Sequence, residues 1–141
     1  MTQEDKELLL KDLSARLTYG VKIETPKGIG NLGTIKLTIF YHELGVNIKA
    51  TERDYFPLDE CKPYLRPMSS MTEEEKVEYY NTMDKETQRN YPNSCDFSES
   101  VYYSNTIKTF DWLNAHHFDY RGLIEKGLAI AVTEENNPYK E

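Results

Sequence analysis

The chain has 141 residues, of which 38% are hydrophobic and 29% charged, a balance typical of one globular domain and not of a disordered chain. The net charge of −7 is uneven: residues 1–71 contain 10 basic and 10 acidic side chains, whereas residues 72–141 contain 7 and 14. Direct binding of DNA or RNA is not expected, because such proteins carry a basic patch that displaces phosphate counterions.

The N-terminal residues, MTQEDKELLLKDL, have neither the basic start nor the apolar stretch of a secretion signal. No apolar run approaches the roughly 18 residues of a membrane-spanning helix. Cys61 and Cys95 do not form a C-x-x-C pair, so we expect two free thiols in a reducing compartment. These features predict a cytoplasmic protein that does not enter a membrane.

The first predicted element is an amphipathic helix. Thr2 and Asp5 have the spacing of a capping box, and leucines recur at helical spacing through Leu17. We therefore expect a helix over residues 3–17, ended by Gly20.

Three short segments then alternate apolar and polar side chains as strands do. The strands are expected at residues 21–24, 35–39 and 46–50, with a loop at 25–33 and a turn at 43–45. Because the connections are short, the sequence predicts an antiparallel meander.

The loop contains Gly28, Gly30 and Gly33 in the spacing G-x-G-x-x-G. A dinucleotide site would need this loop to open into a helix, whereas here it leads into a strand. A protein kinase loop does lie between strands, but the chain has no H-R-D motif and is too short for a second lobe. We interpret the segment as a hairpin loop whose glycines accept positive φ.

Residues 55–71 carry three prolines and are expected to be extended, crossing the sheet or forming its edge. A second capping box, Thr72 with Glu75, predicts a helix over residues 73–89. The apolar stripe expected on this helix is Val77, Tyr80 and Met83, with Tyr79 beside it.

The remaining chain is expected to contain a loop at 90–100 and then a helix. Side chains typical of a buried helix face recur every three or four positions at Ile107, Phe110, Leu113 and His117. Asp119 is expected to cap a short helix closed by Gly127, followed by a strand or buried extension at 128–132. The sequence thus predicts a single α+β domain over residues 1–132 and a flexible C-terminal tail over 133–141. In this fold an N-terminal helix, a small antiparallel sheet that could curl into an SH3-like partial barrel, and two further helices pack together.

The candidates for chemistry are His116, His117 and Asp119. Adjacent histidines on one helix point about 100° apart, so both rarely bind one metal ion. A histidine oriented by Asp119 could instead act as an acid or base. The structural interpretation, which we favour, is that His117 belongs to the buried stripe and Asp119 caps the next helix. No cofactor and no metal are expected.

Two stretches resemble known sequences. The segments KPYLRPMSSMTEEEK (62–76) and FDWLNAHHFDYRGLIEKGLAI (110–130) resemble parts of a family of small uncharacterised proteins encoded by gut bacteria and their phages or mobile elements. That family has no assigned activity. The resemblance therefore implies a genomic context and a shared architecture, and transfers no catalytic residue.

The 11 tyrosines suit a recognition role, because tyrosine is enriched at binding surfaces, although the same rings could cover a thin core. The leading hypothesis is a non-enzymatic protein-binding module that acts on a host protein, with an oligomeric state that the sequence does not set. The expected binding residues are Trp112, His116, Tyr120, Arg121 and Tyr79.

Two alternatives stay open. One is a small hydrolase or nuclease that uses His116 or His117 with Asp119. The other is an acidic mimic of nucleic acid, which would need the acidic side chains at 73–78, 84, 86, 96 and 99 to line one face.

Overall fold

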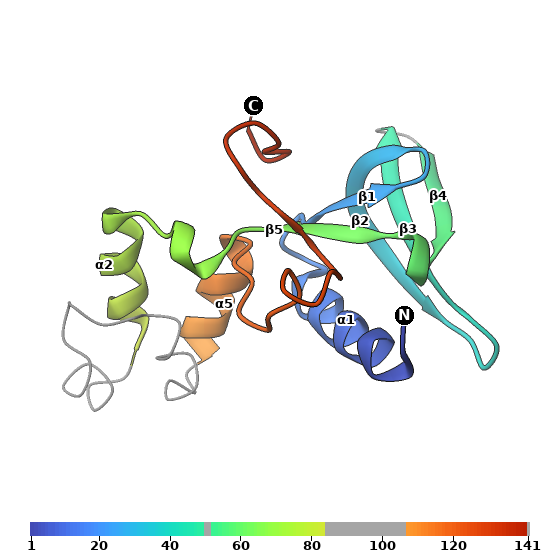
Figure 1. Ribbon diagram of the computed structural model, residues 1–141, viewed down its shortest axis with the longest axis horizontal. Helices are drawn as coiled ribbons and strands as arrows, with labels where there is room; N and C mark the ends of the chain where they lie inside the picture. Colours follow the sequence, from blue (N-terminus) through green and yellow to red (C-terminus); the bar gives the residue numbers. More distant parts are fainter. Residues whose placement is uncertain (50–51, 84–106, 141) are drawn as a thin grey trace.

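The computed structural model describes residues 1–49, 52–83 and 107–140 and confirms the α+β class (Figure 1). The elements in chain order are α1 (Gln3–Arg16), β1 (Lys22–Thr25), β2 (Gly28–Leu37), β3 (His42–Lys49), β4 (Glu52–Pro57), β5 (Lys62–Leu65), α2 (Glu73–Thr82), α5 (Ile107–Ala115) and β6 (Ile130–Ala131). Short 3-10 helices at Leu58–Glu60 and Met68–Ser70 flank β5. The predicted loop at 90–100 lies outside the described residues.

The sheet has six strands in the order β4-β3-β2-β1-β5-β6. Every neighbouring pair is antiparallel except β5 and β6, which run parallel. The sheet is open, with β4 and β6 at its edges. The proline-bearing segment is extended as predicted: it supplies the end of the edge strand β4 and then β5, which returns to pair with β1.

The turn between β2 and β3 lies at Thr38–Tyr41, so the turn expected at 43–45 is wrong. The Thr38 hydroxyl donates to the Tyr41 carbonyl at 2.9 Å and accepts from the amides of Phe40 and Tyr41 at 3.3 and 3.0 Å. These bonds from one side chain fix a tight turn. Gly45 instead pairs with Thr34 inside the β2–β3 ladder.

The glycine-rich segment is also not a loop, because β2 begins at Gly28 and only residues 26 and 27 form the turn. Of its three glycines only Gly28 has a positive φ, 127°. Glycine is needed at position 30 because the backbone of β3 lies close to it. A Cβ at that position would lie 2.6 Å from the Asn47 carbonyl oxygen of β3. At Gly33 the nearest atoms belong to the exposed Arg53 side chain instead.

Helix α1 packs on the sheet and confirms the predicted helix at 3–17, including the Thr2 and Asp5 capping box. Gly20 follows it with a φ of 71°. Leu9 and Leu13 are fully buried against strand residues, and burying one such side chain contributes about 1.5–3 kcal/mol. The other buried members of this sheet core are Val21, Ile23, Leu32, Leu44, Val46, Phe56, Leu58, Cys61, Leu65, Leu123, Leu128 and Ala129.

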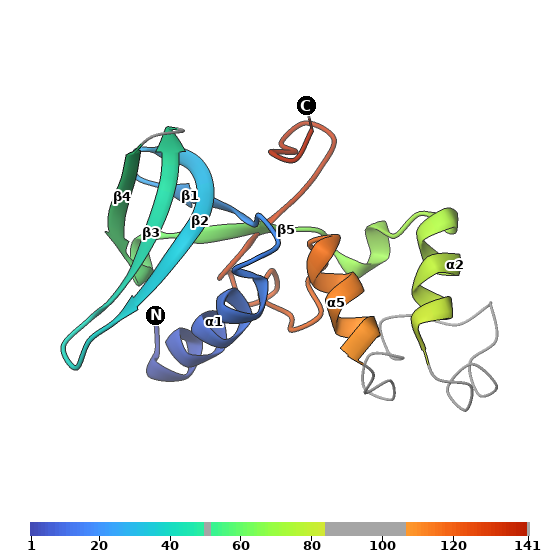
Figure 2. The same cartoon turned by 180° about the vertical axis from the view of Figure 1, so that it is seen from behind.

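A second core forms where α2 and α5 meet, at the end of β5 away from β4 (Figures 1 and 2). Its buried side chains are Met71, Tyr79, Met83, Leu113 and Phe118. The Thr72 and Glu75 capping box starts α2 as predicted, and the part of the expected helix beyond Met83 lies outside the described residues. Of the apolar stripe predicted on α2, Met83 and Tyr79 are buried and Tyr80 packs partly buried against this core. Val77 was predicted wrongly, because it is 59% exposed.

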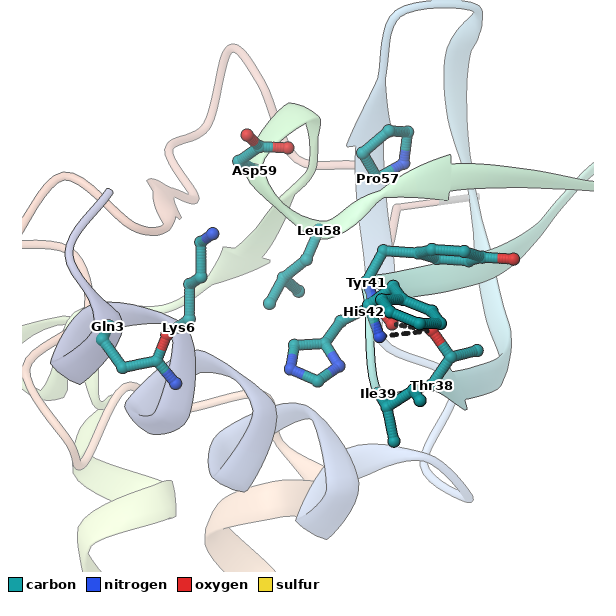
Figure 3. Close-up of a pocket in the computed structure, with 10 residues that line it drawn as sticks. Gln3, Lys6, Thr38, Ile39, Tyr41, His42, Pro57, Leu58 and Asp59 are labelled. Carbon is teal, nitrogen blue, oxygen red and sulfur yellow. Dashed lines mark hydrogen bonds between the residues drawn. The ribbon is translucent and has the colours of Figure 1, made fainter.

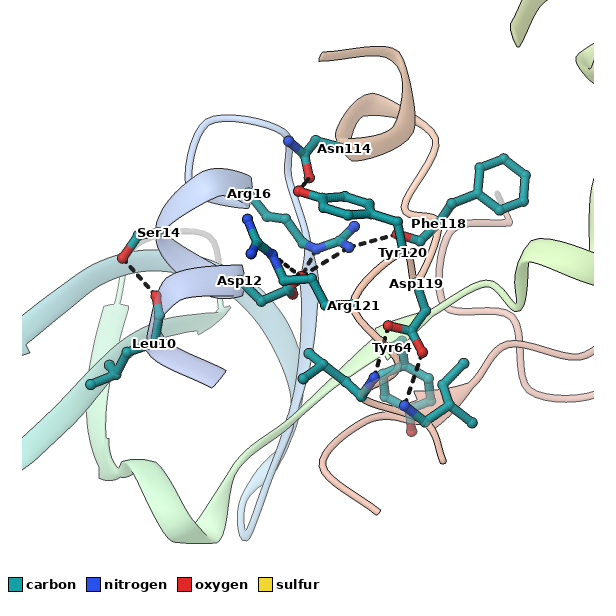
Figure 4. A network of polar contacts seen from close by, with 12 residues as sticks. Leu10, Asp12, Ser14, Arg16, Tyr64, Asn114, Phe118, Asp119, Tyr120 and Arg121 are labelled. Atoms are coloured by element: carbon teal, nitrogen blue, oxygen red, sulfur yellow. Dashed lines mark hydrogen bonds and ion pairs between the residues drawn. The ribbon is translucent and has the colours of Figure 1, made fainter. Parts of the chain in front are cut away.

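A buried ion pair joins the two cores (Figure 4). The Arg16 guanidinium donates to both carboxylate oxygens of Asp12, at 2.7 and 3.1 Å, and to the Phe118 carbonyl at 2.6 Å. Both charged side chains are fully buried. Arg121 approaches the same carboxylate at 3.5 Å, and Arg16 lies over the Tyr120 ring. The second core is thereby attached to the helix that covers the sheet.

The C-terminal segment differs from the prediction in two places. Residues 120–127 form turns rather than a short helix, although the Asp119 carboxylate accepts the amides of Leu123 and Ile124 as a cap would. The tail is not free at Tyr139, whose hydroxyl donates to the Tyr64 carbonyl at 2.7 Å and accepts from the Lys22 amide at 3.0 Å. Residues 128–132 do supply the predicted strand, as β6.

The close approach at Gly30 predicts the effect of adding one methyl group. Gly30→Ala should lower the free energy of unfolding by about 1–3 kcal/mol, because the β3 backbone cannot yield without moving the strand. Gly33→Ala is the matched control and should cost less than about 1 kcal/mol, because an exposed arginine side chain can move away. Urea titrations of the three proteins measure the difference, and equal costs at the two positions would contradict this account.

The buried ion pair predicts a second difference. Asp12→Asn should destabilise the protein by about 3–5 kcal/mol, because it leaves the Arg16 charge buried without a counter-ion. Asp54→Asn removes the partner of the exposed Lys27 and should change stability by no more than about 1 kcal/mol. Thermal unfolding followed by circular dichroism compares the two, and a similar small loss in both variants would argue against the role given to Arg16.

Candidate functional site

The predicted acid or base pair is not assembled. Both Asp119 carboxylate oxygens are occupied by backbone amides, those of Leu123 at 3.0 Å and Ile124 at 2.9 Å. The His116 ring bonds the Trp112 carbonyl at 2.9 Å through Nδ1. In the part of the chain that the structure describes, no hydrogen bond joins Asp119 to either histidine, and no three His, Cys, Asp or Glu side chains converge as a metal site requires.

His117 is held by packing and backbone contacts. It lies in the turn that follows α5 and has a φ of 62°. Its carbonyl accepts the Arg66 amide at 2.7 Å, and its ring stacks on Tyr139 with centroids 3.8 Å apart. Burial, reinforced by the nearby positive charges of Arg16, His116, Arg66 and Lys22, lowers the pKa of His117 to about 4. The imidazole is therefore neutral at pH 7.

The aromatic residues expected to bind a partner pack largely on one another. Trp112 stacks on His116 at 4.1 Å and on Tyr79 at 5.5 Å, and Tyr79 is fully buried. Tyr79 is therefore a core residue and does not offer a contact surface. Tyr120 lies under Arg16 and Arg121 and donates to the Asn114 side chain at 2.8 Å. The structure brings these residues together, but their contacts are to the protein's own core.

Residues 62–76 and 110–130, the two stretches that carry the resemblance, meet at Arg66. Its amide donates to His117 and its carbonyl accepts the Asp119 amide, while its guanidinium pairs with Glu75 through two bonds of 2.7 Å and covers the Phe118 ring. The Arg66 hydrogen bond, aided by those from Thr72, lowers the pKa of Glu75 to about 2 despite partial burial. These two stretches therefore form one structural unit around Arg66.

Among the described residues, the main exposed apolar feature lies at the end of the β2–β3 hairpin. We call residues 37–41, with the sequence LTIFY, the hairpin tip. Ile39 is 91% exposed, Phe40 85% and Leu37 62%. The hairpin projects beyond the rest of the sheet in Figures 1 and 2. Adjacent large apolar side chains this exposed are unusual in a monomeric protein and mark interaction surfaces.

A hollow of about 390 Å³ lies beside the hairpin tip (Figure 3). Its lining residues are Gln3, Lys6, Thr38, Ile39, Phe40, Tyr41, His42, Pro57, Leu58 and Asp59. Lys6 comes from α1 on one side, His42 from the hairpin on the other, and Leu58 extends into the space between them. The Nδ1 atom of His42 is buried and has no hydrogen-bond partner among the described residues. The hollow therefore combines Leu58 with polar lining side chains such as Lys6 and Asp59 that a bound molecule could contact.

Comparisons of the chain with models of protein families, with curated protein sequences and with solved structures found no match. In the described residues, no helix is long and apolar enough to cross a lipid bilayer.

Sequence reasoning missed the hairpin tip because it placed Ile39 inside a strand. The alternation of residues 35–39 continues without a break toward Phe40, so the apolar pattern gave no sign of a turn. The usable signal was Thr38, whose hydroxyl can close a turn onto amides two and three positions later. A turn at that position would have left two large apolar side chains without a strand to bury them.

The low pKa of His117 predicts how stability depends on pH. In the unfolded chain His117 takes up a proton near pH 6.5, whereas in the folded protein it does so only near pH 4. The contribution of the neutral His117 to the free energy of unfolding is therefore complete above pH 6.5 and is lost as the pH falls toward 4. His117→Asn, which tolerates the positive φ, should show a smaller decrease in unfolding free energy between pH 7 and 5. His116→Asn keeps the burial that is the main cause of the low pKa of His117 and should therefore keep most of the wild-type decrease. Denaturant titrations across this range make the comparison, and identical slopes for wild type and His117→Asn would contradict it.

Proposed function

We propose that this protein is a non-enzymatic protein-binding module and that its contact surface is the hairpin tip. The observation that carries the proposal is the exposure of Ile39 and Phe40 at the end of a projecting hairpin, next to the hollow. Large apolar side chains at the centre of an interface supply most of its binding energy when they enter a partner's pocket. A rigid hairpin presents them with little loss of backbone freedom.

The partner in this proposal is a host protein, and the protein acts in the cytoplasm as a phage or mobile-element accessory factor. The support for this context is the resemblance of residues 62–76 and 110–130 to the gut bacterial and phage family. The arrangement around Arg66 gives those residues a structural role. The binding surface can therefore lie on a different part of the chain.

The alternatives receive less support from the described residues. A hydrolase that uses a histidine with Asp119 would need that carboxylate to release two backbone amides. An acidic mimic would need a continuous row of free carboxylates, but Glu75 pairs with Arg66 and Glu73 with Lys76. Within residues 73–78 this leaves the exposed Glu74 and Glu78 outside the ion pairs of the described residues. The other acidic residues expected in that mimic, at 84, 86, 96 and 99, lie outside the described residues.

The proposal is tested by capturing partners from a bacterial host lysate with wild type, Phe40→Ser and Ile39→Ser. We expect a specific captured protein to fall at least about tenfold in both tip variants, as loss of a central apolar anchor does. Val77→Ser is the matched control, because it removes an exposed apolar side chain from α2 and should leave capture unchanged. All three positions are exposed, so stability should change by about 0.5 kcal/mol or less. Equal capture by wild type and the tip variants would overturn the proposal.

A further inference from the structure

The hollow beside the hairpin tip contains a buried polar atom without a partner. The Nδ1 atom of His42 makes no hydrogen bond to any of the described residues. Buried polar atoms in native proteins nearly always bond protein, ordered water or a ligand, because an unsatisfied one costs free energy. The hollow has a volume of about 390 Å³, at the small end of the range for ligand sites. It therefore offers a small molecule both room and a hydrogen-bonding group.

Lys6 adds a positive charge to the same space. It lines the hollow from α1 and is partly buried. Within residues 1–49, 52–83 and 107–140 it has no ion-pair partner. A partly desolvated ammonium attracts an anion more strongly than one in bulk water does. A carboxylate in the hollow can therefore accept from Lys6, and also from His42 Nδ1 in the tautomer that carries its proton there.

Asp59 limits which anions the hollow accepts. Its exposed carboxylate lines the hollow from the segment after β4, and in the described part of the chain it too lacks an ion-pair partner. Figure 3 shows the Lys6 side chain extending from α1 in the direction of Asp59. A ligand with only negative charge, such as phosphate, is repelled by this carboxylate. A ligand that carries an ammonium group as well as a carboxylate matches both side chains.

The apolar part of the lining supplies the remaining contact. Leu58 is nearly fully buried and projects toward the His42 ring (Figure 3). Pro57 and Phe40 line the same hollow. An aliphatic group placed against these side chains leaves water, which favours binding in proportion to the apolar area covered. The lining therefore suits a zwitterion that also carries an apolar side chain.

We propose that the hollow binds an α-amino acid or dipeptide with an apolar side chain. The carboxylate of the ligand pairs with Lys6 and bonds His42 Nδ1, its ammonium group pairs with Asp59, and its side chain packs against Leu58. This inference goes beyond the proposed function. It assigns a small-molecule site to the hollow and does not depend on the hairpin tip binding a host protein.

The first experiment is isothermal titration calorimetry on the full chain with L-leucine and L-leucyl-L-leucine, each up to about 10 mM, a range that reveals millimolar binding. We expect at least one of the two to bind, and the tighter of them identifies the free amino acid or the dipeptide as the source. N-acetyl-L-leucine lacks the ammonium group, and L-leucinamide and inorganic phosphate lack the carboxylate, so each should bind at least about tenfold more weakly.

Three results of this titration would overturn the inference. They are the absence of binding by either zwitterion, equal binding of L-leucine and its acetylated form, and tighter binding of phosphate. Capture of a host protein through the hairpin tip, together with no binding of either zwitterion, would overturn this inference and leave the proposed function standing.

The second experiment tests the two charges. Lys6→Gln and Asp59→Asn should each weaken binding of the zwitterion by about tenfold or more, because each removes a charged partner of the ligand. Lys11→Gln and Glu60→Gln are the matched controls and should leave binding unchanged. They remove the same charges from exposed positions on α1 and beside Asp59 that do not line the hollow. Circular dichroism verifies that each variant is folded, and wild-type binding by Lys6→Gln would contradict the site.

The third experiment locates the ligand by nuclear magnetic resonance. Adding the zwitterion should shift the imidazole signals of His42, because that ring lines the hollow. The signals of His116 and His117 should stay in place, since neither ring lines it. Binding that shifts those two signals and leaves His42 unchanged would place the ligand elsewhere and overturn the inference.

Discussion

The fold depends on a guanidinium held away from water. Arg16 is fully buried, and its charge is balanced by Asp12 one turn earlier in α1 and by the Phe118 carbonyl. A buried charge without such partners would cost several kcal/mol, so the groups that bond it cannot separate in the native state. Asp12 belongs to the helix that covers the sheet, and Phe118 belongs to the core between α2 and α5. One side chain thereby fixes the position of the helical part relative to the sheet.

Local signals in the sequence were sufficient for the helix starts and insufficient for the sheet. The capping boxes at Thr2 and Thr72 depend on residues three positions apart, and both formed as predicted. The return of β5 to β1, the parallel pairing of β6 and the bonds of Arg16 depend on residues far apart in the chain, which periodicity cannot reveal. The prediction of a loop for the glycine-rich segment was wrong for a related reason. The need for Gly30 is set by the β3 backbone beside it and not by its own neighbours in sequence.

The contact surface that we propose differs from the binding residues predicted from the sequence, for reasons that the residues explain. Tryptophan, tyrosine and histidine have both an apolar body and a polar tip, so the same composition suits a core and an interface. Trp112 and Tyr79 pack in the core, because their rings stack on each other between α2 and α5. Ile39 is aliphatic, and its sequence pattern predicts a buried strand residue. It is exposed instead, because the turn closed by Thr38 places it outside the strands. The exposure of Ile39 is therefore set by the backbone turn and not by the hydrophobicity of its side chain.

The long span of the Arg16 contacts has a consequence for the order in which the molecule is made. Arg16 bonds a carbonyl 102 positions later, and the Lys22 amide bonds a hydroxyl 117 positions later. On the ribosome, helix α1 and strand β1 are therefore made more than 100 residues before these partners. During that interval Arg16 has Asp12 as a partner but lacks the Phe118 carbonyl that it bonds in the folded protein. The native contacts of Arg16 therefore cannot be completed until residue 118 has been made, and a nascent chain stalled before that point lacks one of the groups that join its two parts.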